Sequence, residues 1–435
     1  MATSTNTADC TPPHHPTFQV HLRADQISGI VRQCLPDYQL LSFEQLQSGK
    51  SYNNRIYYLD VEALPSNSTL SSFARTQKLV IKVNGRFFGS AKVRNEVACL
   101  RLLETYCPNI PSPRVVAWSE GGRTETAESR IATEASKTLA SVRLAAQADW
   151  ILMTRVPGEP ISTMQLSSEE IPQVIAQLAG YVADWRTNIP RQPLCGNVCP
   201  GAKNDGSTYP NLTVRDPDFA NLGFSIGGLI GEDLFPVKPI ATLADYFKVR
   251  ILDRINRLRN NEVFRRNWAI LDSLTAFAEN DLPSLKLISA KLDSSIVSSP
   301  FLFTHYDLSP RNILVSGYPP RVTGIVDFEF AGFFSQHEEF VNDKINNEGD
   351  WSDETYQMYM DNLERNGVDS PLHGFEKVSW TQHVMLEELI QHIAPWWLPG
   401  PHSGAALEDK LQEAELLIKN RLQSLLVSNA RETRV

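Results

Sequence analysis

The sequence predicts an α+β fold in which a small, mostly antiparallel sheet carrying one helix precedes a larger, mainly helical part. The first third of the chain has short apolar runs rich in β-branched and aromatic residues, separated by polar turns. The later part has amphipathic stretches with the 3.6-residue period of helices. Apolar residues make up 42% of the chain and charged residues 21%, which is ordinary for a globular protein and argues against disorder.

Length and charge limit the class of protein further. The 435 residues could form two or three domains of average size. A net charge of −9 argues against a protein that coats nucleic acid. The chain has no apolar stretch long enough to span a bilayer, and its N-terminus lacks the apolar core of a secretory signal. Six cysteines are too few for a disulfide scaffold, so a reducing, cytoplasmic location is expected.

The expected elements of the first part follow one another in the order β-β-β-α-β-β. Residues 1–16 are expected to form a frayed tail, and residues 1–38 together a tail and a leading helix. The predicted strands and the predicted helix are strands 40–47, 55–61 and 78–83, the helix 90–106, and strands 114–118 and 150–156.

The rest of the chain is predicted to be mainly helical. The polar segment 119–149 is expected to be a surface insertion, with a lid containing one short helix as the alternative. The segment 195–239 is rich in Gly, Pro and Asn and is expected to be a loop. Helices are predicted over residues 171–185, 243–258, 267–278, 352–365, 376–393 and 407–426.

The densest group of chemically active residues lies in segments 303–315 and 322–329. Asp307 and Asn312 are five positions apart across a loop, and Asp327 follows Asn312 by fifteen. Phosphoryl transfer needs one carboxylate to accept the proton of the attacking hydroxyl, and further oxygen ligands to hold magnesium against the phosphates. The spacing therefore indicates Asp307 as the base, with Asn312 and Asp327 as metal ligands.

Complementary residues occur upstream in the order that such a site needs. Lys82 lies on a predicted strand, and Glu96 lies fourteen residues further on, in the next predicted helix. This spacing suits an ion pair that directs the ammonium group at the α- and β-phosphates. The turn between the first two strands contains Ser48, Gly49 and Ser51, and its backbone N–H groups are expected to cover the nucleotide phosphates.

These motifs together resemble the aminoglycoside phosphotransferase family, which is related to the choline/ethanolamine kinases. The resemblance rests on His305-x-Asp307-x4-Asn312, on residues 325–329, and on four upstream blocks in family order. Those blocks are residues 80–83, 95–100, 110–115 and 151–158. It implies a protein-kinase-like bilobal fold, with a nucleotide-binding N-lobe over 39–156 and a C-lobe over 157–435. One bilobal unit thus replaces the two or three domains that length alone suggested.

The resemblance also implies a function and further site residues. It implies an ATP- and Mg²⁺-dependent kinase that phosphorylates a hydroxyl of a small molecule. Adenine is expected to pair with the backbone near Thr154 and Val156, beside Met153. His305 is expected to orient the catalytic loop, with direct proton transfer as the alternative.

Two further site residues have open roles. Glu329 either joins the metal shell or faces solvent. Arg311 either braces the loop or contacts phosphate. Tyr306 stands where the family often has glycine.

The sequence leaves alternatives open for the acceptor and for the activity. Acidic and aromatic residues of the last helices are candidate walls for a cationic acceptor. These candidates are Trp351, Tyr356, Tyr359, Glu387, Glu388, His392, Trp396 and Trp397. A choline/ethanolamine kinase-like enzyme and a catalytically silent nucleotide-binding protein are the alternatives to an aminoglycoside phosphotransferase-like kinase. Segment 327–332 also resembles the choline kinase form of the metal-binding segment.

Overall fold

The computed structural model describes residues 11–47, 51–64, 76–87, 89–120, 123–126, 149–200, 224–226, 228–230, 239–285, 300–345 and 349–432. Ser48, Gly49 and most of the insertion 119–149 lie outside these ranges. The chain forms two compact units. The first contains Met1–Glu159, Ile313–Gly317 and Val322–Phe330, and the second contains Pro160–Asn312, Tyr318–Arg321 and Ala331–Val435.

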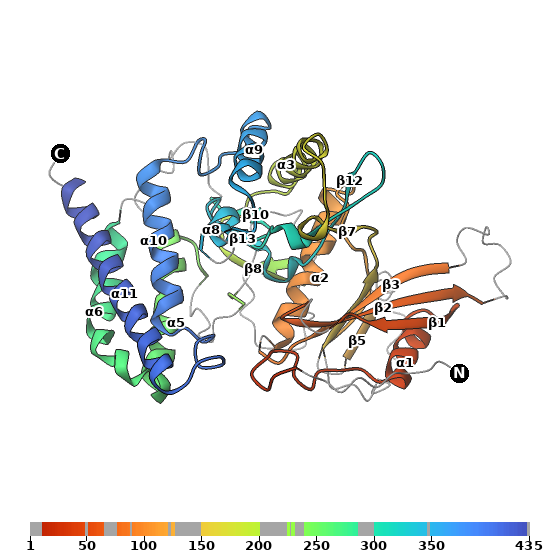
Figure 1. Ribbon diagram of the computed structural model, residues 1–435, viewed down its shortest axis with the longest axis horizontal. Coiled ribbons are helices and arrows are strands. Elements are labelled where there is room, and N and C mark those ends of the chain that lie inside the picture. Colours follow the sequence, from red (N-terminus) through yellow and green to blue (C-terminus); the bar gives the residue numbers. More distant parts are fainter. Residues whose placement is uncertain are drawn as a thin grey trace. The chain divides into compact units, whose positions relative to one another are not determined.

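The first unit is built on a six-stranded sheet in which neighbouring strands are antiparallel (Figure 1). In sheet order its strands are β1 (Tyr38–Gln45), β2 (Asn54–Ala63), β3 (Thr76–Asn84), β6 (Trp150–Thr154), β4 (Val115–Glu120) and β5 (Arg123–Thr126). Five of these strands match the predicted ones to within a few residues. The sixth, β5, lies in the segment that the sequence analysis expected to be an insertion.

Two helices accompany this sheet, α1 (Ala24–Cys34) and α2 (Gly89–Tyr106). Ile81 and Val83 of β3 share a buried apolar core with Ile27 of α1. Because side chains alternate along a strand, Lys82 points to the opposite face, and there it meets α2. The alternation of β3 therefore places one lysine on the helix face of the sheet.

Residues 11–16 differ from the frayed tail that the sequence predicted, because they are bonded into the first unit. The amide of Arg86 donates to the carbonyl of Pro16 at 3.0 Å, and the Arg86 guanidinium donates to the carbonyls of Pro13 and His15. Arg55 donates to the carbonyl of Thr17 at 2.9 Å. Arg55 of β2 and Arg86 in the turn after β3 thus hold the segment through its backbone oxygens.

β7 (Glu159–Pro160) and the 3₁₀ turn η3 (Ile161–Thr163) follow the sheet. Later the chain returns to the first unit for β11 (Ile313–Ser316), most of β12 (Arg321–Ile325) and the turn η8 (Phe328–Phe330). Turn η8 packs against α2. The segment that carries Asp327 therefore belongs to the same unit as Lys82, although helices of the second unit lie between the two in sequence.

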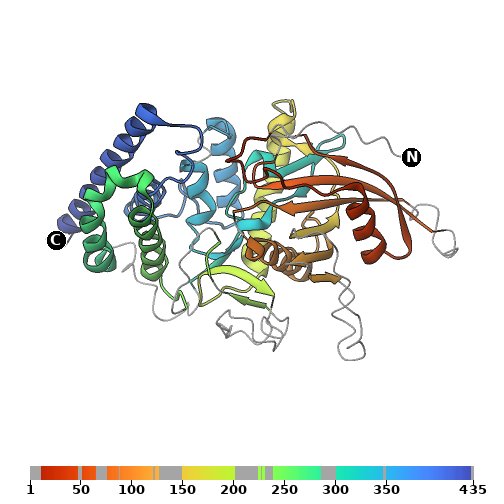
Figure 2. The ribbon, with the colours of Figure 1, turned by 90° about the horizontal axis from the view of Figure 1, so that it is seen from below.

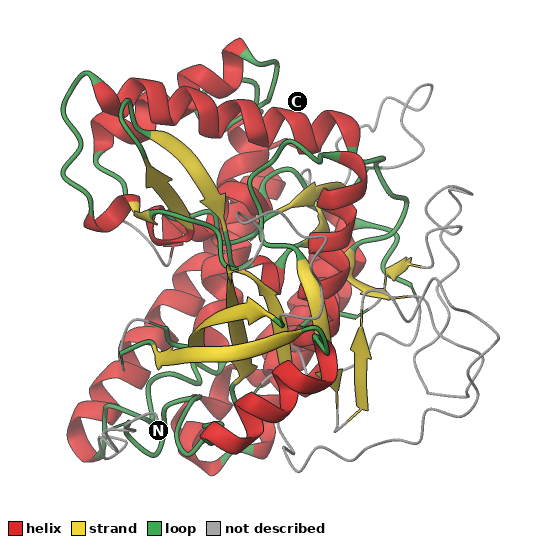
Figure 3. Ribbon diagram, turned by 90° about the vertical axis from the view of Figure 1, so that its right-hand side faces the viewer, coloured by secondary structure: helices red, strands yellow, loops and turns green. Residues whose placement is uncertain are grey.

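The second unit is mainly helical (Figures 2 and 3). Its α-helices are α3 (Glu170–Asn188), α5 (Leu243–Asn260), α6 (Leu271–Ala276), α8 (Glu338–Ile345), α9 (Asp353–Arg365), α10 (Lys377–Ile393) and α11 (Gly404–Glu432). A small sheet, in the order β10-β13-β8-β9, contains β8 (Gly196–Pro200), β9 (Phe224–Ile226), β10 (Leu302–Thr304) and β13 (Gly332–Phe334). Helix α10 packs against α5, α8 and α11.

The sequence predicted the long helices of this unit well and the short elements poorly. The predicted helix 267–278 is a mixed stretch: the 3₁₀ turn η4 (Glu262–Ile270), α6, the π-turn η5 (Phe277–Asp281) and the 3₁₀ turn η6 (Leu282–Ser284). Helix α8 was not predicted, and two short strands lie in the expected loop 195–239. Among the described residues, no helix is both long enough and apolar enough to cross a membrane.

Candidate active site

Lys82 lies at the centre of the first group of predicted site residues, all of them in the first unit. Its Nζ is 2.9 Å from Oε1 and 2.7 Å from Oε2 of Glu96, which comes from α2. The same Nζ is 2.5 Å from Oδ1 of Asp327 and 2.9 Å from Oε2 of Glu329. The structure thus brings together Lys82, Glu96 and Asp327, although Lys82 and Asp327 are 245 positions apart in the sequence.

Burial and charge shift the pKa values of this group. Burial by itself lowers the pKa of Lys82, but the carboxylates of Asp327, Glu329 and Glu96 outweigh it and raise that pKa well above the ordinary value. Burial raises the pKa of Glu96 to about 7, against the opposing effect of Lys82. Lys82 is therefore a fixed cation with more negative than positive charge around it.

Glu329 is buried, with a side chain only 1% exposed, so the solvent-facing alternative from the sequence is wrong. The side-chain amides of Asn53 and Asn54 donate to its two oxygens at 2.9 and 2.6 Å. A second buried lysine, Lys92 of α2, lies 3.2 Å from Oε2. Burial opposes ionisation of Glu329, but Lys82 and Lys92 together lower its pKa.

Lys92, Asn54 and Asn95 also contribute to this network, and their roles were not predicted from the sequence. Lys92 also donates to Oδ1 of Asn54 at 2.8 Å, and Asn95 donates to the backbone carbonyl of Glu329 at 2.9 Å. The spacing held one usable signal, because Lys92 is four residues before Glu96 and therefore on the same helix face. These bonds tie the strand that follows the predicted nucleotide loop to the segment that carries Asp327.

The carboxylates around Lys82 fit a divalent cation that prefers oxygen ligands. Ligand oxygens of Glu96, Asp327 and Glu329 all lie within 4.8 Å of one another. Glu96 and Glu329 are almost fully buried, whereas the Asp327 side chain is 32% exposed. Asp327 is therefore the member of the three that an incoming Mg²⁺ can reach.

The second group of predicted residues surrounds Asp307 in the second unit. Nδ2 of Asn312 donates to the backbone carbonyl of Asp307 at 2.8 Å and to its Oδ2 at 3.2 Å. Nη2 of Arg311 donates to Oδ1 of Asp307 at 2.8 Å, and Nη1 donates to Asp350 at 2.8 Å. Arg311 therefore braces the loop, as one of its two alternatives predicted.

His305 is fully buried and bonds within the same loop. Its Nδ1 accepts a hydrogen bond from the backbone N–H of Asp307 at 3.3 Å. The backbone N–H of His305 donates to both carboxylate oxygens of Glu339 at 3.2 Å. Glu339 in turn pairs with the buried Arg186 at 3.6 Å. The imidazole thus holds the backbone of the residue that carries the predicted base.

Two residues of these motifs have the left-handed backbone conformation that favours glycine. Tyr306 has φ +73° and Asp327 has φ +71°. The conformation of Tyr306 explains why glycine is common at this position in the family that the sequence resembles. Its ring packs against Phe334 with centroids 5.2 Å apart, which provides packing to offset the backbone strain. Tyr306 directly precedes the candidate base Asp307, and Asp327 itself carries a candidate metal-binding carboxylate.

The predicted adenine-binding residues lie at the end of β6 in the first unit. Met153 is buried and pairs with Val80 of β3. The amide N–H of Thr154 already donates to the carbonyl of Arg114 at 2.9 Å, so it is not free for a base. Val156 follows β6 and is half-buried. Of the predicted phosphate loop, Ser51 is described and half-buried, whereas Ser48 and Gly49 lie outside the described residues.

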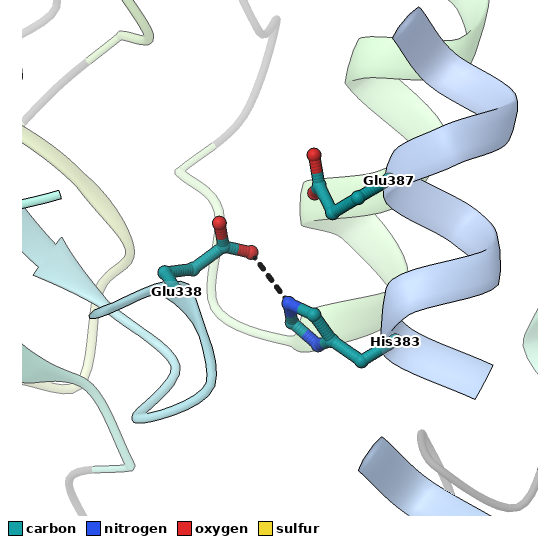
Figure 4. Close-up of side chains that lie close together, drawn as sticks. All are labelled: Glu338, His383 and Glu387. Carbon is teal, nitrogen blue, oxygen red and sulfur yellow. Dashed lines mark hydrogen bonds and ion pairs between the residues drawn. The ribbon is translucent and has the colours of Figure 1, made fainter. Parts of the chain in front are cut away.

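A separate buried group joins Glu338 of α8 with His383 and Glu387 of α10 (Figure 4). Nε2 of His383 is 2.8 Å from Oε1 of Glu338. Both oxygens of Glu387 accept from the guanidinium of Arg250 on α5. Because Arg250 already neutralises Glu387, a cation has no free carboxylate pair here.

This geometry corrects part of the predicted acceptor wall. Glu387 and Tyr359 are buried, each with 2% of its surface exposed, and the Glu387 carboxylate forms an ion pair with Arg250. Trp396 and Trp397 are instead exposed, at 44% and 36%. Glu388, the other acid of the predicted wall, pairs with Arg421 at 2.5 Å. The predicted wall therefore does not form a single surface with unpaired acidic groups.

The fold and the paired lysine define a protein-kinase-like α+β protein, and comparison with known proteins gives its family. The model of the phosphotransferase enzyme family, APH, matches residues 60–342, which include Lys82, Glu96, Asp307, Asn312 and Asp327. The chain belongs to this family and is a phosphotransferase. Curated protein sequences give no match.

Solved structures of aminoglycoside phosphotransferases resemble the chain in fold. The ADP-bound aminoglycoside phosphotransferase APH(2'')-Ib has a TM-score of 0.51 at 13% identity, with 92% of this chain and 99% of that one covered. The gentamicin–APH(2'')-IIa complex has a TM-score of 0.49 at 15% identity, with 93% and 97% covered. At 13% identity the first likeness establishes a shared fold.

Proposed function

We propose that this phosphotransferase moves the γ-phosphoryl group of ATP to a hydroxyl of a small molecule, with Mg²⁺. The observation that carries the proposal is the buried ammonium of Lys82, which contacts both Glu96 and Asp327 within 2.9 Å. A lysine held by a helix carboxylate, beside a carboxylate that suits a metal, is the arrangement that phosphoryl transfer needs. The proposal assigns this group and the Asp307 group to one reaction.

On the nucleotide side, Lys82 binds the α- and β-phosphates and Glu96 holds it in place. Because the N–H of Thr154 is occupied, the adenine contacts fall to the carbonyl of Thr154 and the N–H of Val156, with Met153 packed beside the ring. Backbone and hydroxyl groups of Ser48, Gly49 and Ser51 cover the phosphates.

Asp327 and the amide oxygen of Asn312 would hold Mg²⁺, because both offer oxygen ligands and the Nδ2 of Asn312 is already used by Asp307. When bound there, Mg²⁺ would neutralise phosphate charge that otherwise repels the attacking hydroxyl. Lys82 contacts Asp327 at 2.5 Å, so binding of nucleotide and metal requires the ammonium to turn from Asp327 toward the phosphates.

In the second group, Asp307 is the general base. Its carboxylate accepts the proton of the acceptor hydroxyl as the oxygen attacks the γ-phosphorus. Arg311 and Asn312 fix the two carboxylate oxygens, and His305 fixes the backbone amide, so His305 is a positioning residue. We expect the reaction in a reducing compartment such as the cytoplasm, because none of the five described cysteines is in a disulfide.

The experiment compares wild type with Asp307→Asn. Calorimetry measures binding of Mg·ATP to both proteins, and release of ADP is measured with a panel of aminoglycosides, choline, sugars and amino alcohols. We expect both proteins to bind Mg·ATP, and only wild type to transfer phosphate. Tight Mg·ATP binding without transfer to any acceptor would favour the silent nucleotide-binding protein, and transfer to choline would favour the choline/ethanolamine kinase-like enzyme.

A further inference from the structure

A cavity in the second unit adjoins the loop that carries Asp307. Its volume is about 380 Å³, and it lies among turn η3, helices α3 and α9, and the 3₁₀ turn η7 (Pro310–Asn312). Figure 1 labels α3 and α9, which pack against each other beside it. Pro310, three residues after Asp307, forms part of its wall. Cavities that bind small molecules typically range from about 300 to 1,000 Å³, so this one suits a compact ligand.

The cavity is lined largely by apolar side chains. Besides Ile161 and Pro310, these are Met164, Leu166, Ile171, Val174, Ile175 and Trp351. Val174 and Ile175 come from the core face of α3, and Trp351 is only 7% exposed. Such a wall gains free energy by removing apolar surface of a ligand from water, at about 25 cal/mol for each Å² buried.

The charge of the lining limits what the cavity can bind. Asp350 is its one charged residue, and the other polar lining residues, such as Gln165 and Thr355, are neutral. Asp350 is already paired with Arg311 at 2.8 Å. A ligand with several positive charges would find no carboxylate to compensate them, and would lose its hydration against an apolar wall.

Arg311 connects this cavity to the proposed base. Its guanidinium bonds to Asp350 at the cavity and to Oδ1 of Asp307, each at 2.8 Å. A single side chain therefore separates the cavity rim from the carboxylate that would take the proton of the acceptor. Asp307 itself is not in the cavity wall, so a ligand must extend past Arg311 to reach it.

We propose that this cavity holds the apolar body of the acceptor, and that the acceptor is a compact alcohol carrying at most one positive charge. Its hydroxyl lies on an arm that reaches Asp307. There the hydroxyl oxygen bonds to the γ-phosphorus, the bond from that phosphorus to the β–γ bridging oxygen breaks, ADP leaves, and the proton passes to Asp307. The inference rests on the proposed kinase function and excludes polycationic aminoglycosides as its substrates.

The experiment fills the cavity and measures phosphate transfer. The variant is Leu166→Trp, at a half-buried lining position on the loop before α3. The matched control is Leu416→Trp, the same change at a 60% exposed position of α11 in the same unit. A second filling variant, Ser162→Trp, changes an exposed rim position. The acceptors are aryl and alicyclic alcohols with arms of two to four carbons, their monoamine analogues, and kanamycin and hygromycin B.

We expect wild type to phosphorylate members of the alcohol panel and neither aminoglycoside. Both filling variants should lower kcat/KM for the alcohols at least about tenfold, and the control should match wild type. Equal behaviour of Leu166→Trp and Leu416→Trp, transfer to an aminoglycoside, or no transfer to any alcohol would each overturn the inference. Mg·ATP binding and slow ATP hydrolysis without acceptor are measured on all four proteins. If wild type neither binds Mg·ATP nor hydrolyses ATP, the proposed kinase function itself is wrong. If wild type does both but transfers phosphate to no alcohol, only the proposed acceptor class is wrong.

Discussion

The side-chain amide of Asn342 donates a hydrogen bond to Oδ1 of Asp307, with Nδ2 and Oδ1 3.1 Å apart. Asn342 lies on α8, which also carries Glu339, the acceptor for the backbone N–H of His305. One short helix therefore holds the loop of the proposed base at two places. This helix was not predicted from the sequence.

Asn342→Leu removes the amide donor while keeping a similar side-chain size. Because Oδ1 of Asp307 then keeps Arg311 as a donor but loses the amide of Asn342, we expect kcat to fall about tenfold. The KM for ATP should stay unchanged, since Asn342 is not among the proposed nucleotide contacts. Steady-state kinetics measure both constants. Asn342→Gln should recover part of the rate, and an equal loss in both variants would contradict a positioning role.

Glu96→Gln tests the ion pair with Lys82. The neutral amide can still accept a hydrogen bond, but the ammonium then turns further toward Asp327 and Glu329. We expect kcat/KM for ATP to fall about ten- to a hundredfold, because Lys82 is no longer directed at the phosphates. Glu104→Gln, on the same helix and 47% exposed, is the control and should behave as wild type. Equal kinetics of the two variants would argue against the pair.

Glu329→Ala tests the buried network of the first unit. The change leaves the cations of Lys82 and Lys92 buried with one shared partner fewer. Breaking a buried ion pair from one side costs about 3–5 kcal/mol, so we expect the free energy of unfolding to fall by about that amount. Urea denaturation measures it.

The double variant Lys92→Met/Glu329→Ala, compared with Lys92→Met and Glu329→Ala alone, separates charge from packing in this network. It removes one cation and one anion together, and should recover part of the lost stability. If the double variant is as unstable as the sum of its single changes, Lys92 and Glu329 do not interact energetically.

Glu338→Gln tests the pH dependence of the buried group on α8 and α10. Burial raises the pKa of Glu338 to about 7, against the opposing effects of Arg250 and Tyr246, and burial lowers the pKa of His383 to about 4. Between pH 4.5 and 7 the folded protein therefore binds more protons at Glu338 than the unfolded chain does, and the stability that Glu338 contributes falls as the pH rises. His383 acts in the opposite direction between pH 4 and 6.5, because there the unfolded chain binds more protons.

In wild type the two effects oppose each other, and Glu338→Gln removes that of Glu338 while that of His383 stays. We expect the unfolding free energy of the variant to rise more steeply from pH 5 to pH 7 than that of wild type, by on the order of 2 kcal/mol. Urea denaturation at both pH values measures the difference, with Glu44→Gln on the exposed face of β1 as the control. Parallel curves for wild type and Glu338→Gln would show that Glu338 stays ionised when folded.

Several parts of the fold could be predicted because their signals are local. The alternation in β2 and β3 and the apolar period of α2 and α3 depend on residues within one element. Helix α8 could not be predicted in this way. It has only eight residues, and its buried Glu338 and Glu339 look like a solvated face in the sequence. Only contacts with His383, Arg186 and His305 show why two acids are buried there.

The candidate site likewise has some residues that could be predicted from the sequence and others that could not. Sequence spacing alone selected Lys82, Glu96, Asp307, Asn312 and Asp327, because phosphoryl transfer demands these residue types in this order. The partners of the buried and catalytic carboxylates depend on tertiary structure. They are Lys92 and two asparagines on Glu329, Asn342 on Asp307, and Arg250 on Glu387. The physical reason is that burial makes an unpaired charge costly, so each buried charge needs a partner, and that partner comes from whichever element the fold places beside it. The order of the reactive groups can be predicted from the sequence, whereas their partners depend on how the elements pack.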